Sequence, residues 1–364
     1  MKTESLGGFD RFRVPAALLV IAIHTGPLLS LNGEANYLLT DILARIAVPF
    51  FFSVSGWFLV PRLLREGRAA LIPFVKKLLL LYGAAVLLYL PLNLYNHTLE
   101  ESGFALLRDV LFNGTFYHLW YFPALVLGAC LVYGLLRILG PRWAWLPALL
   151  LYAAGLLGDS YFGLTAALPP LRAGYEALFL LFDYTRNGLF FPPVFLLLGG
   201  WLALRPARRS AAWYGAGLLL SLALLTAEGL LVQRLALARF DALYLSLPLC
   251  VGFLLRWLQR LSLPSAPALR DWAAAVYVLH PWCIVLMPGR RRGGGPHRPA
   301  GGQLSCTLSG RGPALLPSGP PPSPASAPPP PPGAGPGSSW TPPPCGTIWP
   351  PWAPFCRRGP ALCR

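Results

Sequence analysis

Long apolar runs separated by short polar breaks fill the chain up to about residue 287. Each run is close to the length that an α-helix needs to cross about 30 Å of hydrocarbon. The pattern therefore predicts an all-α polytopic membrane protein with about nine transmembrane helices. A shorter apolar stretch at 171–183 is expected to be re-entrant or interfacial. The predicted spans are 14–31, 40–60, 74–94, 118–137, 142–158, 187–204, 212–233, 240–257 and 268–287.

The composition agrees with this interpretation. The chain has 364 residues, of which 55% are hydrophobic and only 12% are charged, a balance that is typical of membrane proteins. The first apolar run has no small-residue cleavage site and leads directly into the second, so no cleavable signal peptide is expected. The seven cysteines are scattered, without the spacing of metal ligands, so no metal site is predicted.

The net charge of +16 first indicates cytoplasmic loops rather than binding to nucleic acid, for which the sequence contains no motif. Basic residues collect in alternate connections, whereas the other connections carry most of the acidic residues. This alternation predicts a multi-pass protein with its N-terminus in the cytoplasm. The basic connections contain Arg62, Arg65 and Arg68; Arg137 and Arg142; Arg205, Arg208 and Arg209; and Arg256, Arg260 and Arg270.

Two ionisable residues stand out in the first span. Arg13 lies at its start, and His24 follows eleven residues later. At about 100° per residue, both side chains share one helix face and lie about 16 Å apart along the axis. His24 is then expected near the middle of the bilayer, where an ionisable group must face protein or water. Histidine exchanges a proton near neutral pH, so His24 is a candidate general base. The alternative is a histidine that only bonds to a neighbouring helix.

Further polar residues lie in or beside later spans. His118 opens the fourth span, and His280 lies in the ninth, where a helix–helix hydrogen bond is the alternative role. Asp183 and Arg186 precede the sixth span and are close enough in sequence to pair with each other.

Two more groups lie near the span ends. Lys76 and Lys77 open the third span, either as positive-inside anchors or as ligands for a phosphate-bearing donor. Trp120 and Tyr121 are predicted to be aromatic anchors at the membrane interface.

Four motifs stand out in these positions: an R-x10-H pattern from Arg13 to His24, PFFFSVSGWFL at 49–59, HLWYFPAL at 118–125 and VYVLHP at 276–281. Together they resemble the acyltransferase-3 family of integral membrane acyltransferases. Arg13 and His24 match the family's R-x10-H pattern, and the likeness covers about residues 8–287. FDYTRNGLFF and HLWYFPAL make the chain most similar to the membrane domain of membrane-bound serine racemases of the vancomycin-resistance type.

The resemblance implies transfer of an acyl group from acetyl-CoA or another acyl-CoA to a hydroxyl or amine, in a bacterial cell membrane. His24 would be catalytic, and Arg13 would bind or orient the donor. Lys76–Lys77 would meet the CoA phosphates, although the family often has arginines there. His118, Asp183, Arg186 and His280 are the other candidate binding residues. No bound cofactor is expected, and the partners are the lipid bilayer, acyl-CoA and an acceptor that the sequence does not identify.

The resemblance also leaves two other functional hypotheses open. In the racemase-type relatives the membrane domain is associated with bringing L-serine to a racemase domain. The second hypothesis is therefore that the chain is an L-serine uptake module of a truncated racemase. The third hypothesis is a truncated product without function, because loss of the family's tenth span leaves helix faces unpacked.

The composition changes sharply after the last span. Residues 288–364 are rich in Pro, Gly, Ser and Arg, so they are expected to form a disordered tail behind a membrane domain at 1–287. Read in a shifted frame, residues 339–352 permit LDxxALRHN, which resembles the start of alanine-racemase-like domains. We interpret the tail as the product of a frameshift, so that no pyridoxal phosphate site is expected. The alternative is a genuine Pro-rich tail that binds SH3-like domains.

Overall fold

The computed structural model describes residues 7–95 and 102–286, and within these ranges the chain is helical without any β-strand. The predicted all-α class is therefore confirmed. The predicted tail at 288–364 lies outside the described residues. The helices are α1 (Gly7–Thr25), α2 (Gly33–Tyr37), α3 (Ala47–Glu66), α4 (Arg68–Tyr95), α5 (Gly103–Arg108), α6 (Tyr121–Trp143), α7 (Trp145–Gly158), α8 (Phe162–Ala166), α9 (Pro169–Leu181), α10 (Pro192–Ala203), α11 (Ala211–Arg234), α12 (Leu247–Arg260) and α13 (Pro267–Leu286). Three short turns, η1 (Leu38–Ile42), η2 (Leu43–Ile46) and η3 (Asp109–Asn113), complete the set.

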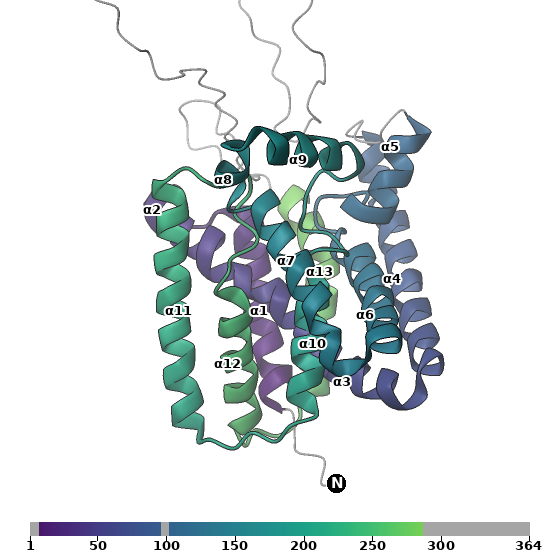
Figure 1. Cartoon of the computed structure of the whole chain (residues 1–364), viewed down its shortest axis with the longest axis vertical. Coiled ribbons are helices and arrows are strands. Elements are labelled where there is room, and N and C mark those ends of the chain that lie inside the picture. Colours follow the sequence, from purple (N-terminus) through teal and green to yellow (C-terminus); the bar gives the residue numbers. More distant parts are fainter. Residues whose placement is uncertain (1–6, 96–101, 287–364) are drawn as a thin grey trace, which may run out of the picture.

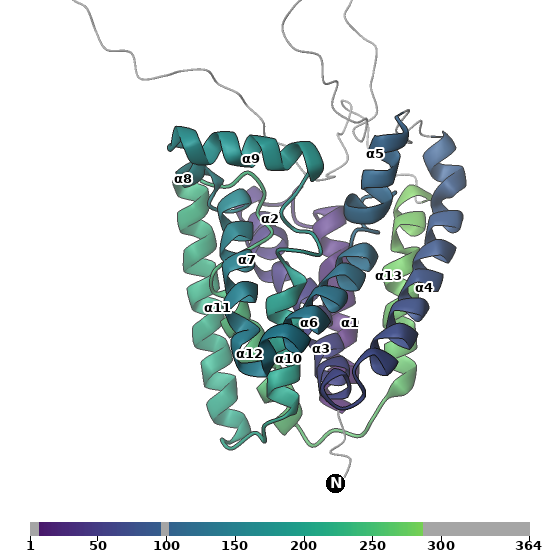
Figure 2. The ribbon, with the colours of Figure 1, turned by 45° about the vertical axis from the view of Figure 1, so that its right-hand side comes forward.

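The long helices run side by side between two ends of a bundle (Figure 1). The first described residues and the connections α3–α4, α6–α7, α10–α11 and α12–α13 lie at one end. These are the connections that carry the clusters of arginines, so the basic residues gather at one end of the molecule. Helix α9, from the stretch predicted to be re-entrant or interfacial, lies across the opposite end (Figure 2).

Several helices present apolar surface to the outside of the bundle. Leu80 on α4 is 76% exposed, and Leu219 and Leu220 on α11 are 69% and 74% exposed. Such leucine-rich outer faces suit contact with lipid tails, which are as apolar as leucine. Among the described residues, four helical segments are long and apolar enough to cross a membrane. Each of the nine predicted spans overlaps a helix, but that all nine helices cross the membrane stays a prediction. The four segments are Gly33–Glu66, Arg68–Tyr95, Tyr121–Trp143 and Ala211–Arg234.

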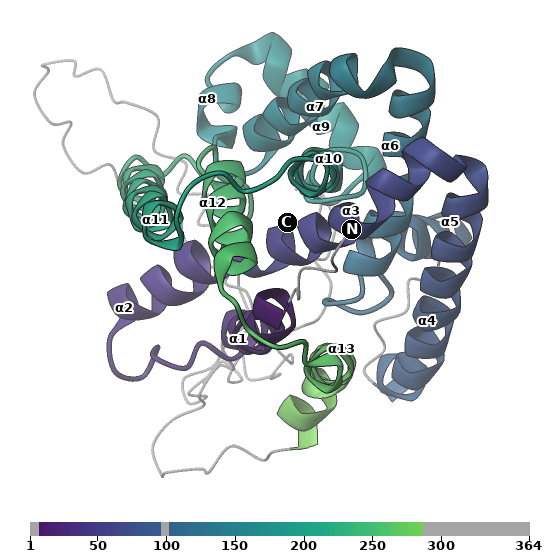
Figure 3. The same cartoon turned by 90° about the horizontal axis from the view of Figure 1, so that it is seen from below.

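Helices α3 and α10 form the centre of the bundle, as the view from the N-terminal end shows (Figure 3). Glycines let the two backbones approach closely. A Cβ atom on Gly199 would lie 1.8 Å from the Ser53 carbonyl oxygen, and one on Gly56 would lie 2.1 Å from that of Leu196. Small residues at such contacts are the usual basis of close helix packing in membranes.

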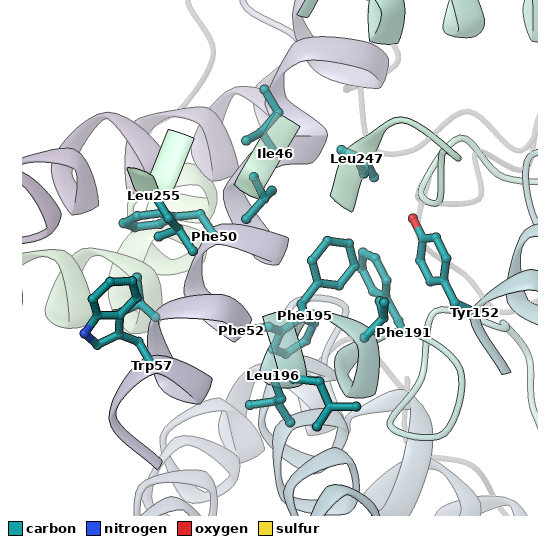
Figure 4. Close-up of a cluster of buried hydrophobic side chains, with 14 of the residues drawn as sticks. Ile46, Phe50, Phe52, Trp57, Tyr152, Phe191, Phe195, Leu196, Leu247 and Leu255 are labelled. Atoms are coloured by element: carbon teal, nitrogen blue, oxygen red, sulfur yellow. The ribbon is translucent and has the colours of Figure 1, made fainter. Parts of the chain in front are cut away.

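Aromatic side chains fill the space around this helix pair (Figure 4). The ring of Phe191 lies 5.7 Å from that of Phe52 and 5.4 Å from that of Phe195, measured between centroids. All three residues are buried. The central pair is therefore held by packing rather than by ion pairs.

Two predicted spans have different bounds in the structure. Helix α1 ends at Thr25 instead of about residue 31, because Gly26 has a φ of +54° and Pro27 follows it. His24 therefore lies in the last turn of α1 and not at its middle. Helix α12 begins at Leu247 instead of 240.

Acidic side chains hold the chain before α12 in a non-helical conformation. A carboxylate oxygen of Asp159 accepts hydrogen bonds from the backbone N–H groups of Ala242 and Leu243, at 2.8 and 3.0 Å. Glu228 accepts one from the backbone N–H of Ser246 at 2.9 Å. These bonds satisfy backbone donors that a helix would otherwise satisfy, so the segment stays outside the helix.

Candidate functional site

Three histidines from distant parts of the sequence meet at one place. The ring of His24 stacks on that of His280 with centroids 5.4 Å apart, and the ring of His118 lies 5.3 Å from that of His280. Helix α1 supplies His24, helix α13 supplies His280, and the turn before α6 supplies His118. Within the described ranges, no group of three or more His, Cys, Asp or Glu side chains has the arrangement of a metal site.

The hydrogen bonds of His280 define its tautomer. Its Nδ1 lies 2.9 Å from the carbonyl oxygen of Tyr277 and 3.2 Å from that of Val276. A carbonyl only accepts, so Nδ1 of the neutral ring carries the proton and Nε2 carries the lone pair. Nε2 has no hydrogen-bond partner among the described residues. The alternative role, a hydrogen bond to another helix, is not observed among the described residues, because both acceptors belong to α13 itself.

A cavity of about 40 Å³ opens beside His24. His118 and Tyr277 line it, together with two arginines, Arg45 from η2 and Arg186 from the segment before α10. The structure thus brings His24, His118 and Arg186 to one cavity, with His280 stacked behind His24. Their functional roles stay predictions.

Asp183 is not among the residues that line this cavity. Its carboxylate lies 3.3 Å from a guanidinium nitrogen of Arg108 and accepts a hydrogen bond of 2.8 Å from the Asn113 side chain. The predicted pairing with Arg186 is therefore wrong. Arg186 instead lies over the rings of Tyr184 and Trp120, at 4.5 and 5.4 Å from their centroids.

A second, larger cavity of about 290 Å³ lies between α1, α3 and α4, toward the end that carries the arginine clusters. Arg13, Arg62 and Lys77 line it, and no acidic residue does. Lys76 is exposed and lies outside this lining. Of the predicted lysine pair, only Lys77 therefore reaches the cavity.

An ion pair fixes the position of Arg13. Its guanidinium lies 2.9 Å from one carboxylate oxygen of Asp10. The other oxygen of Asp10 accepts hydrogen bonds from the backbone N–H of Ala266 and the hydroxyl of Ser265, at 3.1 and 3.2 Å. Asp10 thereby connects α1 to the segment just before α13.

Tyr121 stands between the two cavities. Its ring lies 5.5 Å from that of Tyr277, which lines the small cavity. Its hydroxyl lies against Ser55, which lines the large one. Its ring also stacks on Phe52 at 4.9 Å. The prediction that Tyr121 and Trp120 are interfacial anchors is wrong, because both rings pack inside the bundle.

Arg45, Tyr121 and Tyr277 are site residues that the sequence analysis did not select. A signal existed for Arg45, which is an ionisable residue inside the second apolar run, where such residues are rare and functional. Tyr277 precedes His280 by three residues, so both lie on one face of the same helix.

Comparison with known proteins agrees with this architecture. The sequence profile of the acyltransferase domain of the acyltransferase-3 type matches residues 6–290. An amino-acid racemase of Enterococcus faecalis is 38% identical over 292 residues, which are 77% of this chain and 41% of that protein. A serine/alanine racemase of Enterococcus gallinarum is 39% identical over 291 residues, 76% of this chain and 40% of that protein.

Another amino-acid racemase of E. faecalis is 45% identical over 209 residues, 57% of this chain and 29% of that protein. The chain thus spans less than half the length of these relatives. No solved structure shows a significant match. With a domain match over nearly all the described residues, the chain belongs to the acyltransferase-3 family of membrane acyltransferases.

Proposed function

We propose that this protein transfers an acyl group from acyl-CoA to a hydroxyl or amine acceptor, with His24 as the general base. The observation that carries the proposal is the position of His24 in a cavity inside the bundle, on the same helix whose other end lines a cationic cavity. The donor phosphates would occupy the cationic cavity near Arg13. The acceptor would occupy the cavity beside His24.

The chemistry requires one proton acceptor at the reacting atom. His24 takes the proton from the acceptor hydroxyl or amine as that atom attacks the thioester carbonyl. A new bond forms between the acceptor and the acyl carbon, the carbon–sulfur bond breaks, and the CoA thiolate leaves and takes up a proton. Positioned general bases contribute about 10²–10⁴ to rate.

The charge of the large cavity supports an anionic donor. Its lining has three cations and no carboxylate, and arginine and lysine are the usual ligands of phosphate groups. Arg13 and Arg62 each also pair with a carboxylate outside the lining, Asp10 at 2.9 Å and Glu66 at 3.2 Å, whereas Lys77 forms no ion pair within the described ranges. With this end of the bundle on the cytoplasmic side, the donor would enter from the cytoplasm, in accord with the arginine clusters in the connections there.

Lys77→Ala is expected to raise the KM for acetyl-CoA roughly tenfold with a smaller change in kcat, because one charge-assisted contact to phosphate is lost. Lys76→Ala is the matched control, since Lys76 is the same residue type one position earlier but lies outside the cavity lining. Its KM is expected to stay within about twofold. Steady-state kinetics on both variants makes the comparison, and equal effects would contradict the assignment.

The transfer itself is tested with purified protein in lipid nanodiscs and acetyl-CoA labelled in the acetyl group. Label moving to small hydroxyl or amine compounds, with release of free CoA, supports the proposal. Absence of both transfer and acetyl-CoA hydrolysis, in protein that binds CoA, contradicts it.

L-serine uptake is the second candidate function, because relatives named amino-acid racemase and serine/alanine racemase share this domain. Labelled L-serine would then enter proteoliposomes that contain the protein and no CoA. Uptake that needs no acyl donor would favour this function over acyl transfer.

We further propose that residues 288–364 are read in a shifted frame. Resequencing the gene from codon 280 through several hundred bases past the stop is expected to give a tenth span and LDxxALRHN. An unchanged frame would contradict this proposal.

A further inference from the structure

The guanidinium of Arg186 makes few polar contacts with the protein. It lines the cavity beside His24, and its Nε has no hydrogen-bond partner among the described residues. Its neighbours are the rings of Tyr184 and Trp120, and the side chain of Tyr184 is also a hydrogen-bond partner of the guanidinium. Aromatic faces stabilise a cation only in part, so a guanidinium placed inside a bundle favours an anionic partner.

The nearby carboxylates are engaged elsewhere. Asp183 pairs with Arg108, and Asp159, whose field reaches Arg186, bonds to the backbone before α12. Among the described residues, none forms an ion pair with Arg186. The second arginine of the cavity, Arg45, is already paired with Asp41 at 2.7 Å. The charge of Arg186 is therefore not neutralised by an ion pair within the described part of the chain and is available to an anion in the cavity.

We propose that Arg186 binds the carboxylate of the acceptor, which makes the acceptor a small hydroxy- or amino-carboxylic acid. A single guanidinium fork suits a planar monoanion, which it can hold through two parallel hydrogen bonds. The cavity volume of about 40 Å³ has room for a few water-sized groups and thus favours a carboxylate over a polyphosphate. The hydroxyl or amine of the same molecule would then face His24.

This inference rests on the proposed function for the role of His24, but its test measures binding and not turnover. The full chain in nanodiscs is titrated by calorimetry with L-serine, glycolate and ethanolamine. Ethanolamine is serine without its carboxylate, and glycolate keeps a carboxylate and a hydroxyl without the amine. L-serine and glycolate are expected to bind at least roughly tenfold more tightly than ethanolamine.

Arg186→Ala is expected to weaken the binding of both L-serine and glycolate by at least roughly tenfold. Arg186→Lys is expected to weaken it by less, because lysine keeps the charge but loses the guanidinium fork. Arg172→Ala is the matched control, since Arg172 is an exposed arginine on α9 outside both cavities. CoA affinity, which depends on the other cavity, reports whether each variant is folded.

Equal affinity for serine and ethanolamine would overturn the inference, as would unchanged carboxylate binding in folded Arg186→Ala. Failure of the wild type to bind either carboxylate would also overturn it. Carboxylate binding that depends on Arg186, in a protein that transfers no acetyl group, would support the inference while the proposed acyl transfer fails.

Discussion

His24→Ala is expected to lower the rate of acetyl transfer by about 10²–10⁴, the contribution of a positioned general base. The loss should appear in kcat, because the imidazole of His24 takes the proton during the reaction. His24 does not line the large cavity where the donor phosphates would bind. Transfer from labelled acetyl-CoA in nanodiscs measures it. Affinity for CoA should stay within about twofold of the wild type.

Thr25→Ala is the control for this variant. Thr25 lies in the same helical turn, but its side chain is exposed and its hydroxyl bonds to the carbonyl of Ile21. Its transfer rate should stay within about twofold of the wild type, because a substitution exposed at a helix end perturbs little. A His24→Ala protein that is folded, binds CoA and retains wild-type transfer would remove His24 from the mechanism.

Gly199→Ala is expected to destabilise the protein by about 1–3 kcal/mol or more, because the new methyl group overlaps the neighbouring helix. Its Cβ would lie 1.8 Å from the carbonyl oxygen of Ser53, and backbone cannot move aside as a flexible side chain can. Helices α3 and α10 would have to separate at the centre of the bundle. Thermal unfolding in detergent, monitored by size-exclusion chromatography, measures the effect, and a lower midpoint is expected.

Gly83→Ala provides the same chemical change in open space. Gly83 lies within α4, and a Cβ atom there meets nothing within 4 Å. Alanine favours helix over glycine by about 0.5–1 kcal/mol, so this variant should be as stable as the wild type or slightly more stable. If both glycine variants unfold at the same midpoint, the α3–α10 contact does not depend on Gly199.

Much of the local structure was accessible from the sequence. Apolar runs predict helices wherever they occur, and a helix overlaps each of the nine predicted spans. The bound of α12 failed because tertiary contacts compete with helix formation, whereas α1 ends early at a local signal, Gly26 followed by Pro27. Residues 240–246 are apolar enough for a span, but Asp159 and Glu228 bind their backbone N–H groups instead.

Candidate site residues could be chosen by type and depth, but not by partner. An ionisable residue inside an apolar run must face protein or water, which selects His24 and His280. His118 and Arg186 lie at the edges of predicted spans and were chosen by residue type. The same rule did not show that Asp183 pairs with Arg108 from a helix about seventy residues away. It also gave no basis for preferring Lys77 to Lys76, because both belong to the same turn of α4.

The sequence by itself determined the helical class, the apolar character of the helices and the clustering of arginines in alternate connections. These properties depend on hydrogen bonds within each helix and on residue-by-residue transfer into lipid. Only the tertiary structure decided that three histidines share one place, that two cavities flank Tyr121, and that Arg186 has no carboxylate partner among the described residues. The physical reason is that apolar helices offer many similar faces, and close contacts between small residues select one arrangement among them.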